Sequence, residues 1–257
     1  MLILLNMKNR RALLFIAIAF TPPLLAQTLA QPMQPIGRFE IDRTEVSIGQ
    51  FQQFADATKT VTAAERAGGG STYEAGWEQR RGWNWRAPFG KPGAANEPAV
   101  HVTYAEAQAF CKWAGKRLPT DAEWGQAAYT ERRSNPPAGF EAGRTYAYPT
   151  GDSPQGANCL GDCGNVLTAP NAITSRGRGH ALVGTTKAGV NGLYDMGANA
   201  WEWVDSGSSI GPGSDKRTRG GSWWYGASAM QDSHNQSKAA DTAVVYIGFR
   251  CARDMRP

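Results

Sequence analysis

Four cysteines are the side chains of this 257-residue sequence that could carry covalent or metal chemistry most directly. Cys159 and Cys163 lie in the segment NCLGDCGN, where two glycines favour a tight loop, and pairing them leaves Cys111 for Cys251. Metal binding is the alternative, but a zinc site would need further ligands and the sequence has only three histidines. A redox couple fits the spacing less well, because dithiol oxidoreductases separate their cysteines by two residues. Of the connectivities that four cysteines allow, we predict 159–163 with 111–251.

The segment GGSWWYGASAM at 220–230 is a second candidate for chemistry. Its three consecutive aromatic residues cannot share one face of a strand, so Trp223 and Tyr225 are expected on one face and Trp224 on the other. Exposed aromatic surface of this kind indicates ligand contact, although an aromatic residue is more often part of the core. His234 follows and could act as an acid–base group, although a lone histidine is more often a surface or hydrogen-bonded residue.

Two carboxylates that flank a turn rich in glycine and alanine could bind a hard cation. They are Asp195 and Glu202 in the segment YDMGANAWEW. Calcium needs several oxygen ligands at once, and a tight loop can supply backbone carbonyls beside the carboxylates. A turn held by side-chain hydrogen bonds is the alternative, and the residues taken alone favour it.

Three helices must position several of these groups, and each begins with the same local signal. Ser47, Thr103 and Thr120 each precede a Glu or Gln by three residues, which is the pattern of a capping box. In the helix after Thr103 the spacing turns Cys111 toward the interior, and Gly115 is placed to end the helix. Elsewhere only short candidate strands remain, so we predict an α+β fold with few helices, short strands and long loops. The strands are expected at 39–42, 99–102, 181–184, 201–204, 220–225 and 246–252.

The first thirty residues are predicted to be a secretory signal peptide rather than part of the fold. From Met7 a basic start is followed by an apolar run over 12–20 and by small residues suited to a leader peptidase. This run is too short to cross a bilayer, which takes about 20 residues, and no later segment is apolar enough. We therefore expect residues 31–257 to form a single domain in the periplasm or outside the cell.

The charge of the chain bears on its partners. Residues 1–30 carry three positive charges and no negative ones, so their removal lowers the formal net charge from +5 to +2. The remaining Lys and Arg residues are scattered rather than gathered in a stripe, which argues against nucleic-acid binding. We expect no nucleic-acid partner and no membrane span.

Six segments, in their order along the chain, resemble the formylglycine-generating enzyme family, also called the sulfatase-modifying factor domain. They are RTEVSIGQF, WNWRAPFG, EPAVHVTYAEAQAFCKWAGKRLPTDAEW, GVNGLYDMGANAWEW, RGGSW and GFRCARD. The resemblance runs from about Phe39 to Asp254 and implies a variant of the C-type lectin fold. It also implies the disulfide between Cys111 and Cys251, and a structural calcium ion. The calcium ligands that it implies are Asp195, Ala198, Ala200 and Glu202, the two alanines through main-chain oxygen.

The resemblance places the active-site region just after Gly220. Oxidising members of the family carry two thiols there, and such soft ligands suit Cu(I). The matching positions here are Tyr225 and Met230, which supply no thiolate, so we expect no copper and no formylglycine chemistry. Together with the neighbouring aromatic residues, the resemblance implies a pocket and catalytic candidates. The pocket residues are Trp83, Trp85, Arg86, Trp201, Ser222, Trp223 and Tyr225, and the catalytic candidates are Ser222, Tyr225 and His234.

Two functions of different class are consistent with these residues. The resembling family includes periplasmic proteins without the copper thiols that mature the chromophore of a pyoverdine-type siderophore. By that analogy the protein is a non-standard, oxidoreductase-like maturation factor for a small aromatic or peptide substrate. The alternative is a non-catalytic, lectin-like binding module for a peptide, a glycan or a partner protein. The fold alone does not decide between them.

Overall fold

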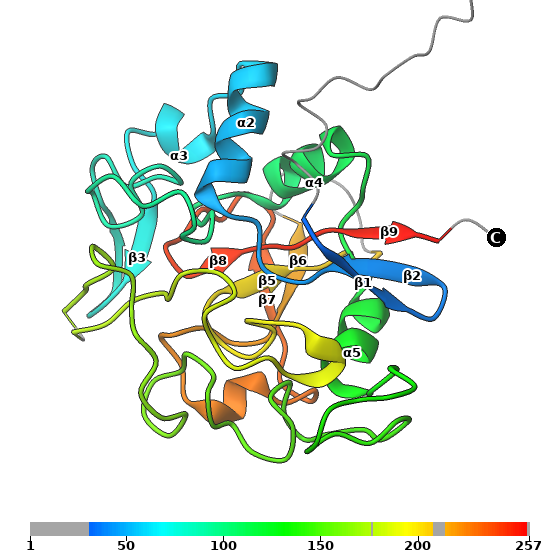
Figure 1. Ribbon diagram of the computed structural model, residues 1–257. Helices are drawn as coiled ribbons and strands as arrows, with labels where there is room; N and C mark the ends of the chain where they lie inside the picture. The colour runs from blue at the N-terminus through cyan, green and yellow to red at the C-terminus, as the bar shows by residue number, and fades with distance from the viewer. Residues whose placement is uncertain (1–30, 176, 208–213, 256–257) are drawn as a thin grey trace, which may run out of the picture. The chain divides into compact units, whose positions relative to one another are not determined.

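The computed structural model describes residues 31–175, 177–207 and 214–255, and its short secondary-structure elements are joined by long loops (Figure 1). The helical elements of these residues are α2 (Ile48–Thr58), α3 (Ala63–Arg66), α4 (Tyr104–Trp113), α5 (Asp121–Tyr129) and the 3₁₀ turns η1 (Val190–Gly192) and η2 (Ala227–Met230). In these ranges no helix has the length and apolar character needed to cross a membrane. The predicted signal peptide lies outside the described residues.

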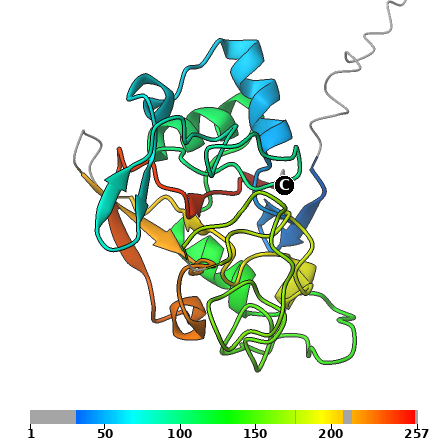
Figure 2. The ribbon, with the colours of Figure 1, turned by 90° about the vertical axis from the view of Figure 1, so that its left-hand side faces the viewer.

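Strands of the described chain form three small sheets, and the predicted α+β class is confirmed. The first sheet has the order β1 (Met33–Ile36), β2 (Phe39–Asp42), β9 (Ala252–Asp254), the second is the hairpin β3 (Ser71–Tyr73) and β4 (Trp77–Gln79), and the third has the order β7 (Gln236–Ala239), β6 (Asp215–Arg219), β5 (Trp201–Trp203), β8 (Ile247–Gly248). A bridge between Ser71 and Val244 joins the hairpin to the chain that follows β7 (Figure 2). The third sheet carries the candidate site.

The three predicted capping boxes are confirmed, and a fourth is present at Thr62 and Glu65. The box of α4 also serves a second helix. The Glu106 carboxylate accepts a hydrogen bond from the Thr103 backbone N–H at 2.9 Å and another from the Ala63 N–H at 2.6 Å. One carboxylate therefore satisfies backbone donors at the starts of both α3 and α4 and holds the two helix ends beside each other.

The strand predictions are confirmed in part. The segments 39–42 and 201–204 contain β2 and β5, and 246–252 contains β8 and the start of β9. The segments 99–102 and 181–184 are not strands, because their backbone N–H groups donate to separate carbonyls and, at Ala181 and Gly184, to side chains rather than to one continuous ladder.

Gly220 and Gly221 turn the chain where a strand was predicted. Their φ angles are 94° and 81°, a region that glycine adopts without strain. A Cβ at Gly220 would lie 2.7 Å from the Met196 carbonyl oxygen, so packing also requires glycine there. The prediction that alternate residues of 220–225 share a strand face is therefore wrong, since the next side chains leave a turn. The rings of Trp223 and Trp224 lie almost perpendicular, at 89°.

Both predicted disulfides are present. Cys111 of α4 is joined to Cys251, which precedes β9, and Cys159 is joined to Cys163 within one loop. Around the first disulfide the core is aromatic. The ring of Phe110 lies 5.8 Å from that of Phe51, nearly parallel to it. The disulfide thus ties α4 to the last strand across the main core.

Candidate functional site

The structure brings together three of the sequence-predicted site residues, Trp201, Tyr225 and His234. The centre of the Trp201 ring lies 5.6 Å from that of Tyr225, and the two rings meet edge to face. The His234 ring is stacked on Trp201, with the ring centres 5.9 Å apart and the planes of Trp201 and His234 at 29° to each other. The third sheet fixes Trp201, because its backbone N–H donates to the Tyr246 carbonyl at 2.9 Å. We refer to Trp201, Tyr225 and His234 as the Trp201 group.

A tight turn positions Tyr225. Its backbone N–H donates to the Ser222 carbonyl at 3.0 Å, and its own carbonyl accepts from the Leu160 N–H at 2.9 Å. The Ser222 hydroxyl accepts from the Trp224 N–H at 3.3 Å, so this side chain is occupied in shaping the turn. Ser222 is also fully buried, so its hydroxyl stabilises the turn and does not face a substrate.

The accessible members of the Trp201 group are its phenol and its imidazole. Tyr225 and His234 are half-buried, whereas Trp201 and Trp223 are 0% exposed. The indole N–H groups of Trp201 and Trp223 find no hydrogen-bond acceptor in the described chain. Buried donors of this kind are uncommon, and a bound polar molecule could satisfy them.

A second phenol extends the aromatic surface beyond the Trp201 group. The Tyr246 ring lies 6.0 Å from that of Tyr225, and the two hydroxyl groups interact. Burial raises the pKa of Tyr246, and its contact with Tyr225 raises this pKa further. Tyr246 therefore stays protonated at neutral pH and can donate to its neighbour.

The structure does not bring the predicted residues Trp85 and Arg86 to the Trp201 group. Trp85 is buried against Phe51, and its indole N–H donates to Glu65 at 3.2 Å. The Arg86 guanidinium lies over the Trp85 ring, 4.1 Å from its centre. These two residues therefore stabilise the packing of α2 against α3.

Trp83 has an indirect connection with the predicted pocket. Its ring lies 5.7 Å from that of Phe89, and Phe89 in turn lies 6.0 Å from Trp223. Phe89 is a link that the sequence did not reveal, because its position depends on how the loop after Trp85 packs.

The two positions that match the family's thiols hold Tyr225 and Met230. Met230 is fully buried in a cluster with Cys159, Cys163 and Ala198, while Tyr225 is half-buried. All four cysteines are in disulfides, so no thiol is free.

Three buried carboxylates surround one buried guanidinium next to the predicted calcium loop. Glu45, Asp195 and Glu202 are at most 3% exposed. Arg250 donates to both oxygens of Glu202, with its shortest contacts at 2.7 Å. Burial raises the pKa of Glu45 and that of Asp195, and neighbouring carboxylates raise the pKa of Glu45 further. These shifts favour the neutral, protonated acids of this acidic cluster, and an additional cation would be needed to keep all three acids ionised.

The predicted calcium loop, residues 195–202, bends at residues whose backbone is in the left-handed conformation. Asp195 and Ala198 have φ angles of 60° and 61°. The Asp195 carboxylate accepts from the Thr186 hydroxyl at 2.6 Å and from the Gly184 N–H at 2.7 Å. At the other end of the loop, the Ala200 N–H donates to the Glu45 carboxylate at 2.9 Å. In the described part of the chain no three His, Cys, Asp or Glu side chains are arranged to hold a metal, so a calcium ion here would need the main-chain oxygens as well.

Sequence reasoning missed Glu45 and Arg250 as members of the acidic cluster. Glu45 precedes the N-cap Ser47 by two residues in an otherwise buried stretch, and an acid flanked by core residues was the available signal. Arg250 lies beside Cys251 and is 0% exposed, which no local pattern indicates.

The fold and the retained loop define a formylglycine-generating-enzyme-like protein with C-type lectin-like architecture. The chain belongs to the family of the sulfatase-modifying factor enzyme 1-like domain, whose model matches residues 25–255. It is 32% identical to the formylglycine-generating enzyme of Streptomyces coelicolor, covering 84% of this chain and 78% of that protein. It is 29% identical to the hercynine oxygenase of Mycolicibacterium thermoresistibile, covering 84% of this chain and 51% of that protein. Among solved structures, PvdO from Pseudomonas aeruginosa is similar with a TM-score of 0.55 and 22% identity, covering 84% of this chain and 80% of that one, which supports the fold.

Proposed function

We propose that this protein is exported after cleavage of residues 1–30 and acts as an oxidoreductase-like maturation factor on an aromatic or peptide substrate. The observation that carries the proposal is the Trp201 group. A half-buried phenol and a half-buried imidazole flank a buried tryptophan, and the phenol, Tyr225, occupies one of the two positions where oxidising relatives need thiols. A pyoverdine-type chromophore precursor represents the substrate class, because it presents a hydroxylated ring on a peptide.

The residues of the Trp201 group suggest separate roles. The half-buried ring and hydroxyl of Tyr225 offer contact to a substrate ring, and the fully buried Trp201 supports Tyr225 from behind. His234 lies over Trp201 and would take a proton from a ring hydroxyl, while dioxygen from solution would accept two electrons and two protons from a dihydroxylated ring and leave as hydrogen peroxide. Orientation of the substrate by an aromatic ring and proton transfer by one base require no thiolate.

The negative part of the proposal is tested with a sulfatase-type cysteine peptide. Purified protein supplied with Cu(I) is expected to consume no oxygen with this peptide and to form no formylglycine, because it has no free thiol pair. Mass spectrometry of the peptide measures the outcome. Formation of formylglycine would refute the proposal.

Turnover of phenolic and catecholic peptides tests the positive part. With a peptide from this series that is converted, Tyr225→Ala and His234→Gln are each expected to lower the rate at least about 100-fold, since the first removes the ring that contacts the substrate and the second removes the group that takes its proton. Tyr194→Ala is the matched control, because the Tyr194 ring contacts Arg43 instead. Product is followed by oxygen uptake and mass spectrometry, and unchanged rates in both variants would contradict the assignment.

An exposed aromatic pair favours the lectin-like binding module as the second candidate. Tyr73 and Trp77 of the β3–β4 hairpin are 41% and 57% exposed, and their ring centres lie 5.4 Å apart. Aromatic residues presented in this way commonly contact sugars or peptides. Saturable binding of a glycan or peptide without any product, lost on Trp77→Ala, would favour this function over the enzyme.

We also propose a structural calcium ion at the acidic cluster. Asp195 and Glu202 would supply carboxylate oxygens, and Ala198 and Ala200 would supply main-chain oxygens. The excess of buried carboxylates over guanidinium supports this assignment, and the ion would neutralise charge there without taking part in the chemistry.

Removal of calcium is expected to lower the melting temperature by about 5–10 °C, because an ion present at about 100 times its Kd stabilises the fold by about 2.7 kcal/mol. Elemental analysis and melting curves in calcium and in EDTA measure this. In Asp195→Ala the EDTA effect is expected to disappear, whereas in the exposed-site control Asp215→Ala it should persist. Protein that is free of calcium and melts identically in both buffers would show that Arg250 alone balances the cluster.

A further inference from the structure

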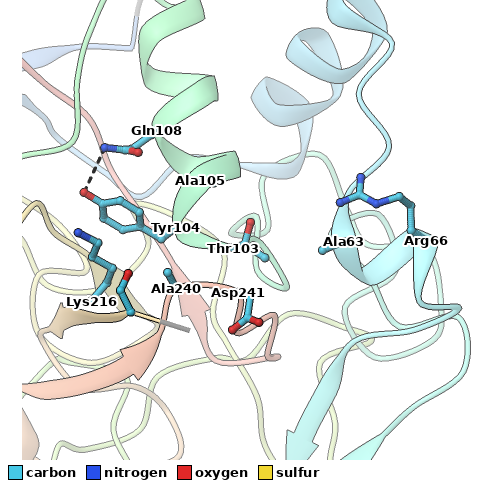
Figure 3. A pocket seen from close by; sticks show the side chains of 10 residues that line it. Ala63, Arg66, Thr103, Tyr104, Ala105, Gln108, Lys216, Ala240 and Asp241 are labelled. Atoms are coloured by element: carbon cyan, nitrogen blue, oxygen red, sulfur yellow. Dashed lines mark hydrogen bonds between the residues drawn. The ribbon is translucent and has the colours of Figure 1, made fainter. Parts of the chain in front are cut away.

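The turn at residues 231–234 carries His234, and the end of strand β6 lies beside this turn. Near its start β6 contributes Lys216 to a separate pocket of about 380 Å³, whose described lining residues include no member of the Trp201 group (Figure 3). At its end β6 contributes Arg219, which is only 4% exposed. Because the burial of a charge is costly unless the charge is paired, this guanidinium must have specific partners.

Arg219 holds the turn through two hydrogen bonds to one residue. Its Nη1 donates to the Asp232 carbonyl oxygen at 2.8 Å, and its Nη2 donates to the Asp232 carboxylate. The His234 N–H closes the turn by donating to the Gln231 carbonyl at 2.9 Å. The planar guanidinium therefore fixes both the main chain and the side chain of the residue that lies two positions before the imidazole.

Helix α5 fixes the guanidinium in turn. The Arg219 guanidinium lies over the Trp124 ring, 5.5 Å from its centre, and the Arg219 Nε lies 3.5 Å from the Asp121 carboxylate. A Cβ at Gly125 would lie 3.3 Å from the Arg219 Nη2 and 3.4 Å from the Asp232 carboxylate, so the helix packs closely on this ion pair. Arg219 thus joins α5, β6 and the turn that carries His234.

The charges around Arg219 are balanced. Two guanidiniums, Arg217 and Arg219, face two carboxylates, Asp121 and Asp232. Glu202, the acid opposite Arg219 on β5, is bound by the guanidinium of the acidic cluster. Arg219 therefore has no unpaired charge with which to bind an anion. Asp121 and Asp232 keep 28% and 69% of their side chains exposed, so replacing Arg219 leaves neither acid fully buried.

Arg219 and the Trp201 ring lie on opposite faces of the third sheet. Arg219 is directly opposite Glu202 in the register of β5 and β6, so these two side chains leave the sheet on one face. Trp201 precedes Glu202 in β5 and leaves on the other face, where His234 is stacked on it. The guanidinium therefore acts on His234 through the backbone of the turn rather than by contact with the imidazole.

From this geometry we propose that Arg219 is a positioning residue, which fixes the turn at 231–234 so that the His234 imidazole stays stacked on Trp201. An acid–base group is effective only while it is held within hydrogen-bonding reach of the proton that it takes. This role rests on the proposed function, in which His234 takes the proton of a ring hydroxyl.

Proton–carbon NMR of protein with labelled histidine tests the positioning without turnover. The chain has three histidines, and His101 and His180 are fully buried. His234→Gln assigns the third signal, which the Trp201 ring shifts upfield because the imidazole is stacked on it. In Arg219→Gln this shift is expected to be lost, so that the signal approaches its position in urea-unfolded protein.

Arg217→Gln is the matched control, because Arg217 lies on the same face of β6 and donates to Asp121 instead of Asp232. The His234 signal of this variant should stay at its position in the parent protein. If Arg219→Gln does not fold, Asp232→Ala decides, since it removes one of the two hydrogen bonds at a side chain that is 69% exposed. An unmoved His234 signal in Arg219→Gln, or in Asp232→Ala where Arg219→Gln does not fold, would overturn the proposal.

Turnover separates this role from a purely structural one. With a phenolic or catecholic peptide that the parent protein converts, Arg219→Gln is expected to lower kcat at least about ten-fold and to leave KM within about two-fold, since Tyr225 still contacts the ring. An unchanged kcat together with a displaced His234 signal would refute the catalytic role of the positioning. If the parent protein converts no peptide, the proposed function fails and the catalytic role fails with it, whereas the NMR signal still decides whether Arg219 fixes the turn.

Discussion

Replacing Cys111 and Cys251 together by alanine is expected to lower the free energy of unfolding by about 5 kcal/mol and the melting temperature by about 10–20 °C. The disulfide closes a loop with a sequence separation of 140, so it removes much of the chain entropy of the unfolded state. Both cysteines are 0% exposed, and alanine leaves no unpaired polar group in the core. Denaturant unfolding of the variant and the parent protein measures the difference.

The second disulfide supplies the matched control. Cys159 and Cys163 are separated by only 4 positions, so their joint replacement by alanine is expected to cost about 2 kcal/mol. Loop length therefore predicts the order of the two losses. Equal losses, or a larger loss for the short loop, would show that packing around the sulfurs rather than chain entropy sets the stability.

Local signals predicted the helices well because the groups that decide them lie within four residues of each other. At Thr103 and Thr120 the hydroxyl and the carboxylate of each capping box bond reciprocally, as their spacing requires. The box at Thr62 follows the same rule, and it was overlooked because α3 is only four residues long. The second use of Glu106, which also caps α3, depends on the tertiary fold and has no local signal.

Strand prediction failed where the partner decides the structure. The apolar segment 99–102 resembles a strand, yet His101 has a φ angle of 57° and its backbone bonds go to single distant residues. A strand needs a continuous ladder with a neighbour, and a sequence pattern does not show whether that neighbour exists. At Gly220 the glycine pair itself was the signal of a turn, and the aromatic residues that follow concealed it.

The part of the candidate site that lies on the single loop after Gly220 could be predicted from the sequence. Tyr225 and His234 lie on the segment that follows Gly220, and Trp201 comes to them through the neighbouring strand β5. Trp85 and Arg86 were expected there by position in the sequence, but Glu65 holds the indole of Trp85 at α3. Such a competing contact between distant segments is invisible before the chain is folded.

Arg250→Met is expected to lower the free energy of unfolding by about 3–5 kcal/mol, because it leaves buried carboxylates without their cation. The Arg250 guanidinium is fully buried and donates to Glu202 and to the carbonyl oxygens of Asp42 and Tyr194 at 3.0 Å and 2.8 Å. Glu45 and Asp195 also attract this guanidinium electrostatically. The variant therefore loses an ion pair and orphans two backbone acceptors at once. Denaturant unfolding at neutral pH measures the loss.

Arg253→Met provides the matched comparison, since Arg253 pairs with Glu40 across β2 and β9 through a contact of 2.7 Å but with 53% of its side chain exposed. Its loss is expected to stay below about 1 kcal/mol, because water and salt screen a surface pair. The double variant Arg250→Met with Glu202→Gln should recover part of the stability of the single one, since it removes one of the orphaned charges. A loss in Arg250→Met no larger than that in Arg253→Met would mean that the acidic cluster is balanced by something other than this guanidinium, either by protons on Glu45 and Asp195 or by bound calcium.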